Sequence, residues 1–92
     1  MAGTIGLAKL FAALLQGGYV CSITDSYTGV TKYSVFAKDD STQTGYRYIG
    51  DITHKEFVQM SAEGLLLTFN HAKGKHGKEY DYHKLPDRWE GA

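Results

Sequence analysis

This sequence has little cysteine, no net charge and no apolar run of membrane-spanning length. It contains one cysteine, Cys21, so no internal disulfide can form, and the apolar residues around it favour a buried thiol. Ten acidic residues cancel ten basic residues, which excludes a strong overall attraction to nucleic acid or to an anionic membrane. The longest apolar run, residues 5–15, is too short to cross a bilayer, which takes roughly 20 residues.

Signs of a targeting segment are equally weak. No positive charge precedes the apolar run, and Lys9 interrupts it, which is unlike a signal peptide. We therefore expect a cytoplasmic protein that makes no membrane contact.

The composition that remains is that of an ordinary globular protein. Apolar residues make up 42% of the 92 residues and charged residues 22%, which is far from the composition of disordered chains. We expect one compact domain over residues 1–92, with residues 85–92 as a loose C-terminal tail. It should fold without a metal, a cofactor or a disulfide.

The first half of the chain predicts one helix followed by three strands. Thr4 can cap a helix over residues 5–16, which the glycine pair at 17–18 ends. Alternating apolar residues then predict strands over residues 19–24 and 30–38, joined by turn residues as an antiparallel hairpin. A polar segment leads into a short third strand over residues 46–50.

The second half predicts a helix and a hairpin. Thr53 and Glu56 have the spacing of a capping box, so a helix should begin at His54, and Gly64 should end it. Strands are predicted over residues 65–70 and 78–85. The expected fold is therefore α+β, in the order α-β-β-β-α-β-β, with two helices packed on a largely antiparallel sheet.

Alternation within the last strand separates its side chains into two sets. Tyr80 and Tyr82 are the apolar candidates for the core, which would leave Glu79, Asp81 and His83 in water. Among the seven tyrosines, Tyr19 and Tyr33 are the strongest candidates for burial in the core.

One stretch, residues 70–84, holds three of the four histidines and four of the eight lysines, and it has three interpretations. It can be simply the tip of a hairpin whose glycines adopt positive φ angles. It can be a basic loop that contacts phosphates, as the wing of a winged-helix protein does, although three strands here separate the two helices. The candidate nucleic-acid contacts are Lys73, Lys75, His76 and Lys78.

The third interpretation is a zinc site, for which the candidate ligands are His71, His76, Asp81 and His83. No thiolate accompanies them and their spacing imposes no geometry, so we expect no metal. The sequence also lacks the motifs of nucleophilic, metallo- and nucleotide-dependent enzymes. Glu79 and Asp81 share a strand face, but such pairs are usually solvated, so we expect no catalytic residues.

The first helix is apolar around nearly its whole circumference, which suggests that a second subunit or a partner covers part of it. A homodimer through this helix would use Leu7, Leu10, Phe11, Leu14 and Leu15. Seven tyrosines and one tryptophan also offer a large rigid contact area. The candidate protein-binding residues are Tyr27, Tyr46, Arg47, Tyr48 and Trp89.

These features favour a small non-enzymatic protein-binding module whose partner is another protein. By analogy with other small α+β chains, we expect a phage or mobile-element accessory protein that inhibits a host defence complex by occupying its surface. The alternative is a nucleic-acid-binding regulator that uses the lysine loop over residues 73–78.

Overall fold

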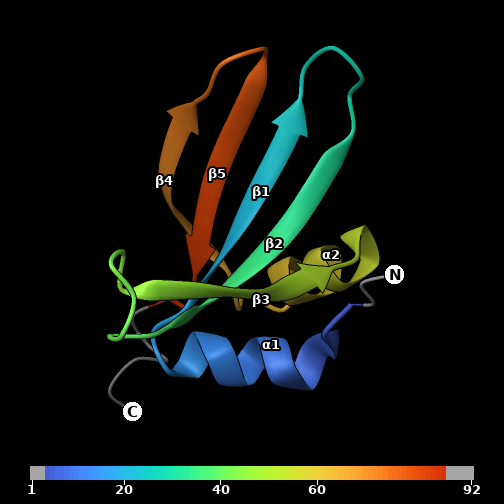
Figure 1. Cartoon of the computed structure of the whole chain (residues 1–92). Helices are drawn as coiled ribbons and strands as arrows, with labels where there is room; N and C mark the ends of the chain where they lie inside the picture. Colours follow the sequence, from blue (N-terminus) through green and yellow to red (C-terminus); the bar gives the residue numbers. More distant parts are fainter. Residues whose placement is uncertain (1–3, 87–92) are drawn as a thin grey trace.

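The computed structural model describes residues 4–86 and confirms an α+β fold with the expected element order (Figure 1). The sheet contains β1 (Tyr19–Asp25), β2 (Thr31–Lys38), β3 (Tyr46–Ile52), β4 (Leu67–Lys73) and β5 (Lys78–Lys84). Their order in the sheet is β3-β2-β1-β5-β4, and every neighbouring pair is antiparallel. Two hairpins, β1–β2 and β4–β5, therefore lie beside each other, with β3 and β4 at the edges.

Helix α1 (Gly6–Leu15) begins differently from our prediction. Its N-cap residue is Ile5, and no side chain caps it. Thr4 instead forms a parallel bridge with Asp51, and the Ile5 amide donates a hydrogen bond to the Asp51 carbonyl at 3.1 Å. The predicted Thr4 cap is wrong because pairing with the edge of β3 already orients this segment.

The predicted end of α1 at the glycine pair is confirmed. The Gly18 amide donates to the Ala13 carbonyl at 2.9 Å, which closes the helix. A Cβ atom on Gly18 would lie only 2.4 Å from the Phe36 carbonyl oxygen, so any larger residue would push α1 away from β2.

Helix α2 (His54–Ala62) begins with the predicted capping box. The Thr53 hydroxyl accepts from the Glu56 amide at 3.1 Å, and the Glu56 carboxylate accepts from the Thr53 amide at 2.9 Å. Each bond satisfies an amide that the helix itself leaves without an acceptor.

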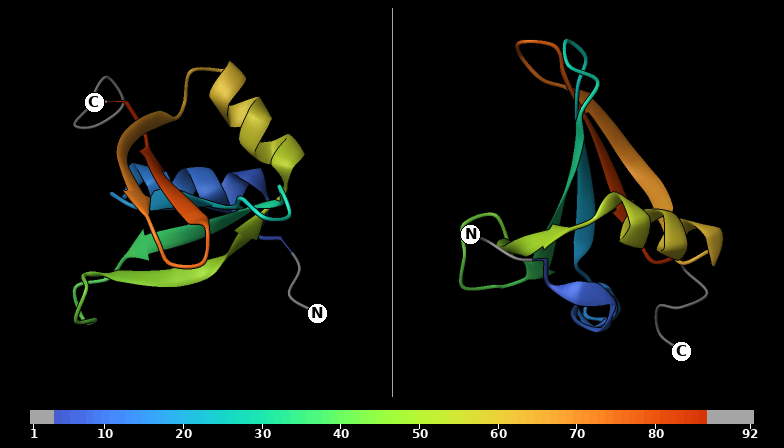
Figure 2. Two further views of the ribbon diagram at one scale, coloured as in Figure 1. Left: turned by 90° about the horizontal axis from the view of Figure 1, so that it is seen from above. Right: turned by 90° about the vertical axis from the view of Figure 1, so that its right-hand side faces the viewer.

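Both helices pack on one face of the sheet, near the end opposite the hairpin tips (Figures 1 and 2). Val20 is the cross-strand partner of Val35 on one side and of His83 on the other, so these three side chains share that face. The core that they join also contains residues of both helices and of the segment after β5, namely Leu10, Ala13, Leu14, Met60 and Leu85. We call this side the helix-bearing face.

Strand β4 begins at Leu67, two residues later than predicted. Leu65 and Leu66 form the connection from α2 and pack against the core, so they are not available for the ladder. The strand then continues to Lys73, beyond the predicted end at Asn70.

Two irregularities bend the sheet, one in the β2–β3 pairing beside Val35 and one in β4 beside Asn70. Bulges of this kind increase the local twist, and β3 runs across the other strands in Figure 1. Gly50 lies at the first irregularity with a φ of 140°, and a Cβ atom there would lie 2.5 Å from the Ile5 side chain. Glycine at this position therefore lets the start of α1 approach β3.

Our assignment of the two faces of β5 is wrong. His83 is buried on the helix-bearing face, whereas Tyr80 and Tyr82 lie on the opposite face and are only partly buried. The physical reason is that His83 is fully hydrogen-bonded in the core. Its Nε2 atom lies 2.7 Å from the Ser22 hydroxyl and its Nδ1 atom 2.9 Å from the Thr68 hydroxyl.

Candidate functional site

The face opposite the helices carries a group of aromatic rings that we call the aromatic face. It comprises Tyr19 (β1), Phe36 (β2), Tyr46 and Tyr48 (β3), Phe69 (β4) and Tyr82 (β5), so every strand contributes at least one ring. Within residues 4–86, no helix covers this side of the sheet.

Tyr19 is the centre of the aromatic face. Its ring stacks on that of Phe36, with centroids 5.0 Å apart and planes 14° apart. The rings of Tyr46 and Tyr82 meet it edge-on at 4.9 and 5.7 Å, and Phe69 does so at 6.3 Å. These are favourable geometries for aromatic pairs, which contribute about 0.5–1.5 kcal/mol each beyond area burial.

Strand register brings these residues together from distant parts of the chain. Tyr19 pairs directly with Phe36, and Phe36 pairs with Tyr48 on the next strand. On the other side of β1, Tyr82 pairs with Cys21. Cys21 is two residues after Tyr19, so the two side chains point to the same face. Since directly paired residues point to the same face, the rings form one continuous row across the sheet.

The rings of the aromatic face are only partly enclosed by one another. Tyr48 remains 49% exposed, Phe69 47% and the neighbouring Leu67 45%. The other large exposed apolar residues lie apart, on α1, α2 or the β1–β2 turn, namely Leu15, Tyr27, Val30 and Val58. A contiguous exposed apolar group on a small protein indicates an interaction surface more strongly than isolated residues do.

Three tyrosines of this face, Tyr19, Tyr48 and Tyr82, have raised pKa values, which favours their neutral form. Burial raises the pKa of Tyr19 and of Tyr82, in each case with a smaller contribution from neighbouring thiol and phenol groups. The Tyr48 hydroxyl donates to Asp51 at 2.6 Å, and this bond raises the pKa of Tyr48. These three rings therefore present neutral surfaces with hydroxyl groups at their edges.

Lysines surround the aromatic face. The Lys84 ammonium lies 5.5 Å from the centroid of the Phe69 ring, a cation–π contact. Lys38 pairs across the ladder with Tyr46. Nearer the hairpin tips, Lys32 contacts Asp51 at 3.7 Å and Lys78 contacts Asp25 at 3.9 Å.

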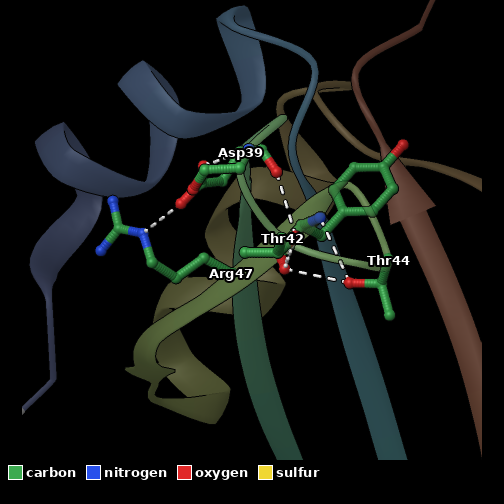
Figure 3. Close-up of polar contacts among 6 residues, drawn as sticks. Asp39, Thr42, Thr44 and Arg47 are labelled. Carbon is green, nitrogen blue, oxygen red and sulfur yellow. Dashed lines mark hydrogen bonds and ion pairs between the residues drawn. The ribbon is translucent and has the colours of Figure 1, made fainter.

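Arg47, a predicted binding residue, is already engaged in the loop between β2 and β3 (Figure 3). Its Nε atom donates to the Asp39 carboxylate at 3.2 Å. Hydrogen bonds from the Ser41 hydroxyl and amide lower the pKa of Asp39, so this carboxylate stays charged. The hydroxyls of Thr42 and Thr44 donate to the Tyr46 carbonyl and hold the start of β3 in place.

The lysine loop is a hairpin tip that docks on the neighbouring turn. The Ser26 amide donates to the Gly77 carbonyl at 2.9 Å, and Gly77 and His76 both have positive φ angles. A shallow hollow of about 280 Å³ between the tips is lined by Ser26, Lys73, Gly74, Gly77, Lys78 and Glu79. Among the candidate phosphate contacts, Lys78 is paired with Asp25, and Lys73 lies opposite Glu79 in the ladder, so part of the local positive charge is offset.

Tyr27 lies at this same end of the molecule and is 80% exposed. Its amide donates to the Asp25 carboxylate at 2.9 Å, as in a turn stabilised by an aspartate side chain. It is therefore accessible to a partner but separate from the aromatic face. Trp89, the other predicted anchor, lies outside the described residues.

The histidines lie in different environments. His71 is half-exposed and contacts Asp81 at 2.5 Å and Glu79 at 3.8 Å. His83 is buried, and burial lowers its pKa more than nearby Asp81 raises it. Among residues 4–86, no three histidine, cysteine or carboxylate side chains gather as a metal-ligand set.

The apolar residues of α1 are largely used within the chain. Leu10 and Leu14 are fully buried, and Leu7 and Phe11 pack against the core, which leaves only Leu15 exposed among the five candidate dimer residues. The remaining outward positions are mainly alanine and polar. Neither α1 nor α2 has the length and apolar character that a membrane span requires.

Sequence reasoning identified Tyr46 and Tyr48 but missed Tyr19, Phe36, Phe69 and Tyr82 as parts of one surface. A signal for three of them was available, because Tyr19, Phe36 and Tyr82 each occupy the strand position beside a residue now seen in the core. Comparison with protein-family models, curated proteins and solved structures finds no match.

Proposed function

We propose that the protein is a non-enzymatic binding module that contacts another protein through its aromatic face. The observation that carries this proposal is the gathering of six rings from all five strands on a side of the sheet without a helix in residues 4–86. The main contact surface is then the aromatic face of the sheet, and not α1 as the sequence suggested.

Aromatic side chains suit this role because each offers a large contact area for the loss of few rotatable bonds. They are also the residues that dominate binding energy at protein interfaces, where single truncations cost about 2 kcal/mol or more. Phe69 and Tyr48 are the best anchors because about half of each is still available for burial. The tyrosine hydroxyls and the surrounding lysines supply the polar rim that such interfaces have.

A chain of 92 residues with a binding face acts most simply by covering part of its partner. Small accessory proteins of phages and mobile elements inhibit host defence complexes in this way. We assign the protein to that class by analogy, on the basis of its small size and α+β fold. Its single cysteine is buried and unpaired, which supports action in a reducing compartment such as the cytoplasm.

Site-specific photo-crosslinking in cells that naturally produce the protein tests this proposal. A photoreactive phenylalanine analogue replaces Tyr48 in one version and Val58 on α2 in the other. These positions are matched, because Tyr48 is 49% exposed and Val58 is 47% exposed. We expect a protein adduct of defined mass from position 48 and a much weaker one, or none, from position 58.

Equal adducts from both positions would contradict the proposal, as would adducts to nucleic acid. An adduct of twice the monomer mass would identify the partner as a second copy. A Phe69→Ala version of the Tyr48 probe should lose most of its adduct, since the neighbouring anchor is removed.

A further inference from the structure

The lysines on the sheet side opposite the helices fall into two pairs that differ in whether a carboxylate already neutralises them. Toward the hairpin tips, Lys32 and Lys78 are each bound to an aspartate of that same face. At the other end, Lys38 and Lys84 have no carboxylate partner within residues 4–86. The uncompensated charge of this face is therefore at the end that holds the rings.

Register places these two lysines on either side of the central ring. Lys84 comes one residue after the Val20–His83 pair and therefore lies on the same face as Tyr19, and its ammonium sits over Phe69. Lys38 is two residues beyond Phe36 on β2 and faces Tyr46. An apolar group that docked on Tyr19 and Phe69 would have a positive charge on each side.

The two acidic residues of β5 lie on the other face of the sheet. Glu79 and Asp81 lie on the helix-bearing side of β5, where both contact His71. Among the ion pairs of residues 4–86, none neutralises Lys38 or Lys84 beside the rings. Complementary charge across an interface selects partners and aligns them.

We propose that the partner segment held by the aromatic face is acidic and apolar, with one or more carboxylates beside a large apolar or aromatic side chain. The proposal rests on the proposed function and specifies the chemistry of the partner. The apolar side chain packs against Tyr19 and Phe69, while the carboxylates contact Lys38 and Lys84. Tyr48 is less suited to bind a carboxylate because its hydroxyl is committed to Asp51.

Charge reversal in the crosslinking assay tests the inference. The double substitution Lys38→Glu, Lys84→Glu, combined with the probe at position 48, should weaken capture about tenfold at low ionic strength, the effect expected of two modest charge contacts. The neutral pair Lys38→Gln, Lys84→Gln should give a smaller loss and controls for folding. Lys55→Glu on the exposed side of α2 should have no effect.

The results separate this inference from the proposed function. If Phe69→Ala abolishes the adduct while both lysine double variants retain the wild-type yield, a protein partner remains but its acidic character is overturned. If probe position 48 gives no protein adduct, the proposed function itself fails.

A direct binding measurement adds a second criterion. Amide chemical shifts of the labelled wild-type protein are recorded with three probes, an acidic peptide Asp-Glu-Phe-Phe-Glu-Asp, a basic peptide Lys-Arg-Phe-Phe-Arg-Lys and a ten-nucleotide oligothymidylate. We expect shifts in β1, β4 and β5 and at the Lys38 end of β2 with the acidic peptide, weakened by salt. Equal or stronger binding of the basic peptide or the oligonucleotide, or no binding of any probe at millimolar concentration, would overturn the inference.

Discussion

Val20 and Val35 are fully buried on the helix-bearing face, whereas Tyr19 and Phe36, one residue away in the same two strands, remain partly exposed on the aromatic face. Both pairs are apolar and both are direct cross-strand partners. The difference arises because α1 and α2 close one side of the sheet, while on the other side the rings contact mainly each other. Apolar residues on both sides of a strand therefore do not guarantee two closed layers in a protein of this size.

This comparison predicts that the largest loss of stability follows truncation on the closed side. Leu14→Ala should cost about 3 kcal/mol in the free energy of unfolding, because it leaves a cavity between α1 and the sheet. Chemical denaturation monitored by circular dichroism measures the loss. A change below about 1 kcal/mol would mean that the side chain is less enclosed than the structure indicates.

Acid should weaken the same closed face through His83. Burial lowers the pKa of His83 in the folded state below the value near 6.5 of the unfolded chain. The contribution of the neutral His83 ring to the free energy of unfolding is therefore fully present above about pH 6.5. It is lost as the pH falls through the lower pKa of the folded state.

Unfolding measured at a series of pH values from neutral to mildly acidic should show this loss for the wild type. The variant His83→Gln, which cannot titrate, should lose stability less steeply over the same interval. Parallel curves for the two proteins would show that His83 does not contribute to the pH dependence.

An intermediate effect is expected at the start of α2. Thr53→Ala removes the acceptor for the Glu56 amide and should cost about 1 kcal/mol. Thermal unfolding compared with Thr4→Ala, an exposed threonine whose hydroxyl caps no helix, shows whether the loss is specific to the cap. Unchanged stability would mean that the capping box contributes nothing measurable.

The smallest effect on stability should come from the aromatic face. Phe69→Ala removes a ring that is 47% exposed, so we expect a cost of no more than about 1 kcal/mol, together with a large loss of partner binding. The contrast with Leu14→Ala defines the difference between the two faces. A cost as large as that of Leu14→Ala would show that Phe69 belongs to a second core.

The sequence alone determined which segments form helices and strands. The capping box at Thr53, the glycine pair after α1 and the alternation in β1, β2 and β5 are local signals, and local hydrogen bonds and sterics are enough to establish the elements. The lack of net charge and of a membrane-length apolar run also follows from the residues themselves.

Only the tertiary structure decided which side chains of these elements enter the core and which form the aromatic face. Alternation shows that β5 has two faces, but whether His83 or Tyr82 enters the core depends on Ser22 and Thr68, which belong to other strands. The start of α1 depends on the edge of β3, and the aromatic face depends on strand register between segments as far apart in sequence as Val20 and His83. Such contacts form between parts of the chain that no local pattern connects, so the surface that we propose as the binding site emerges only when the sheet is complete.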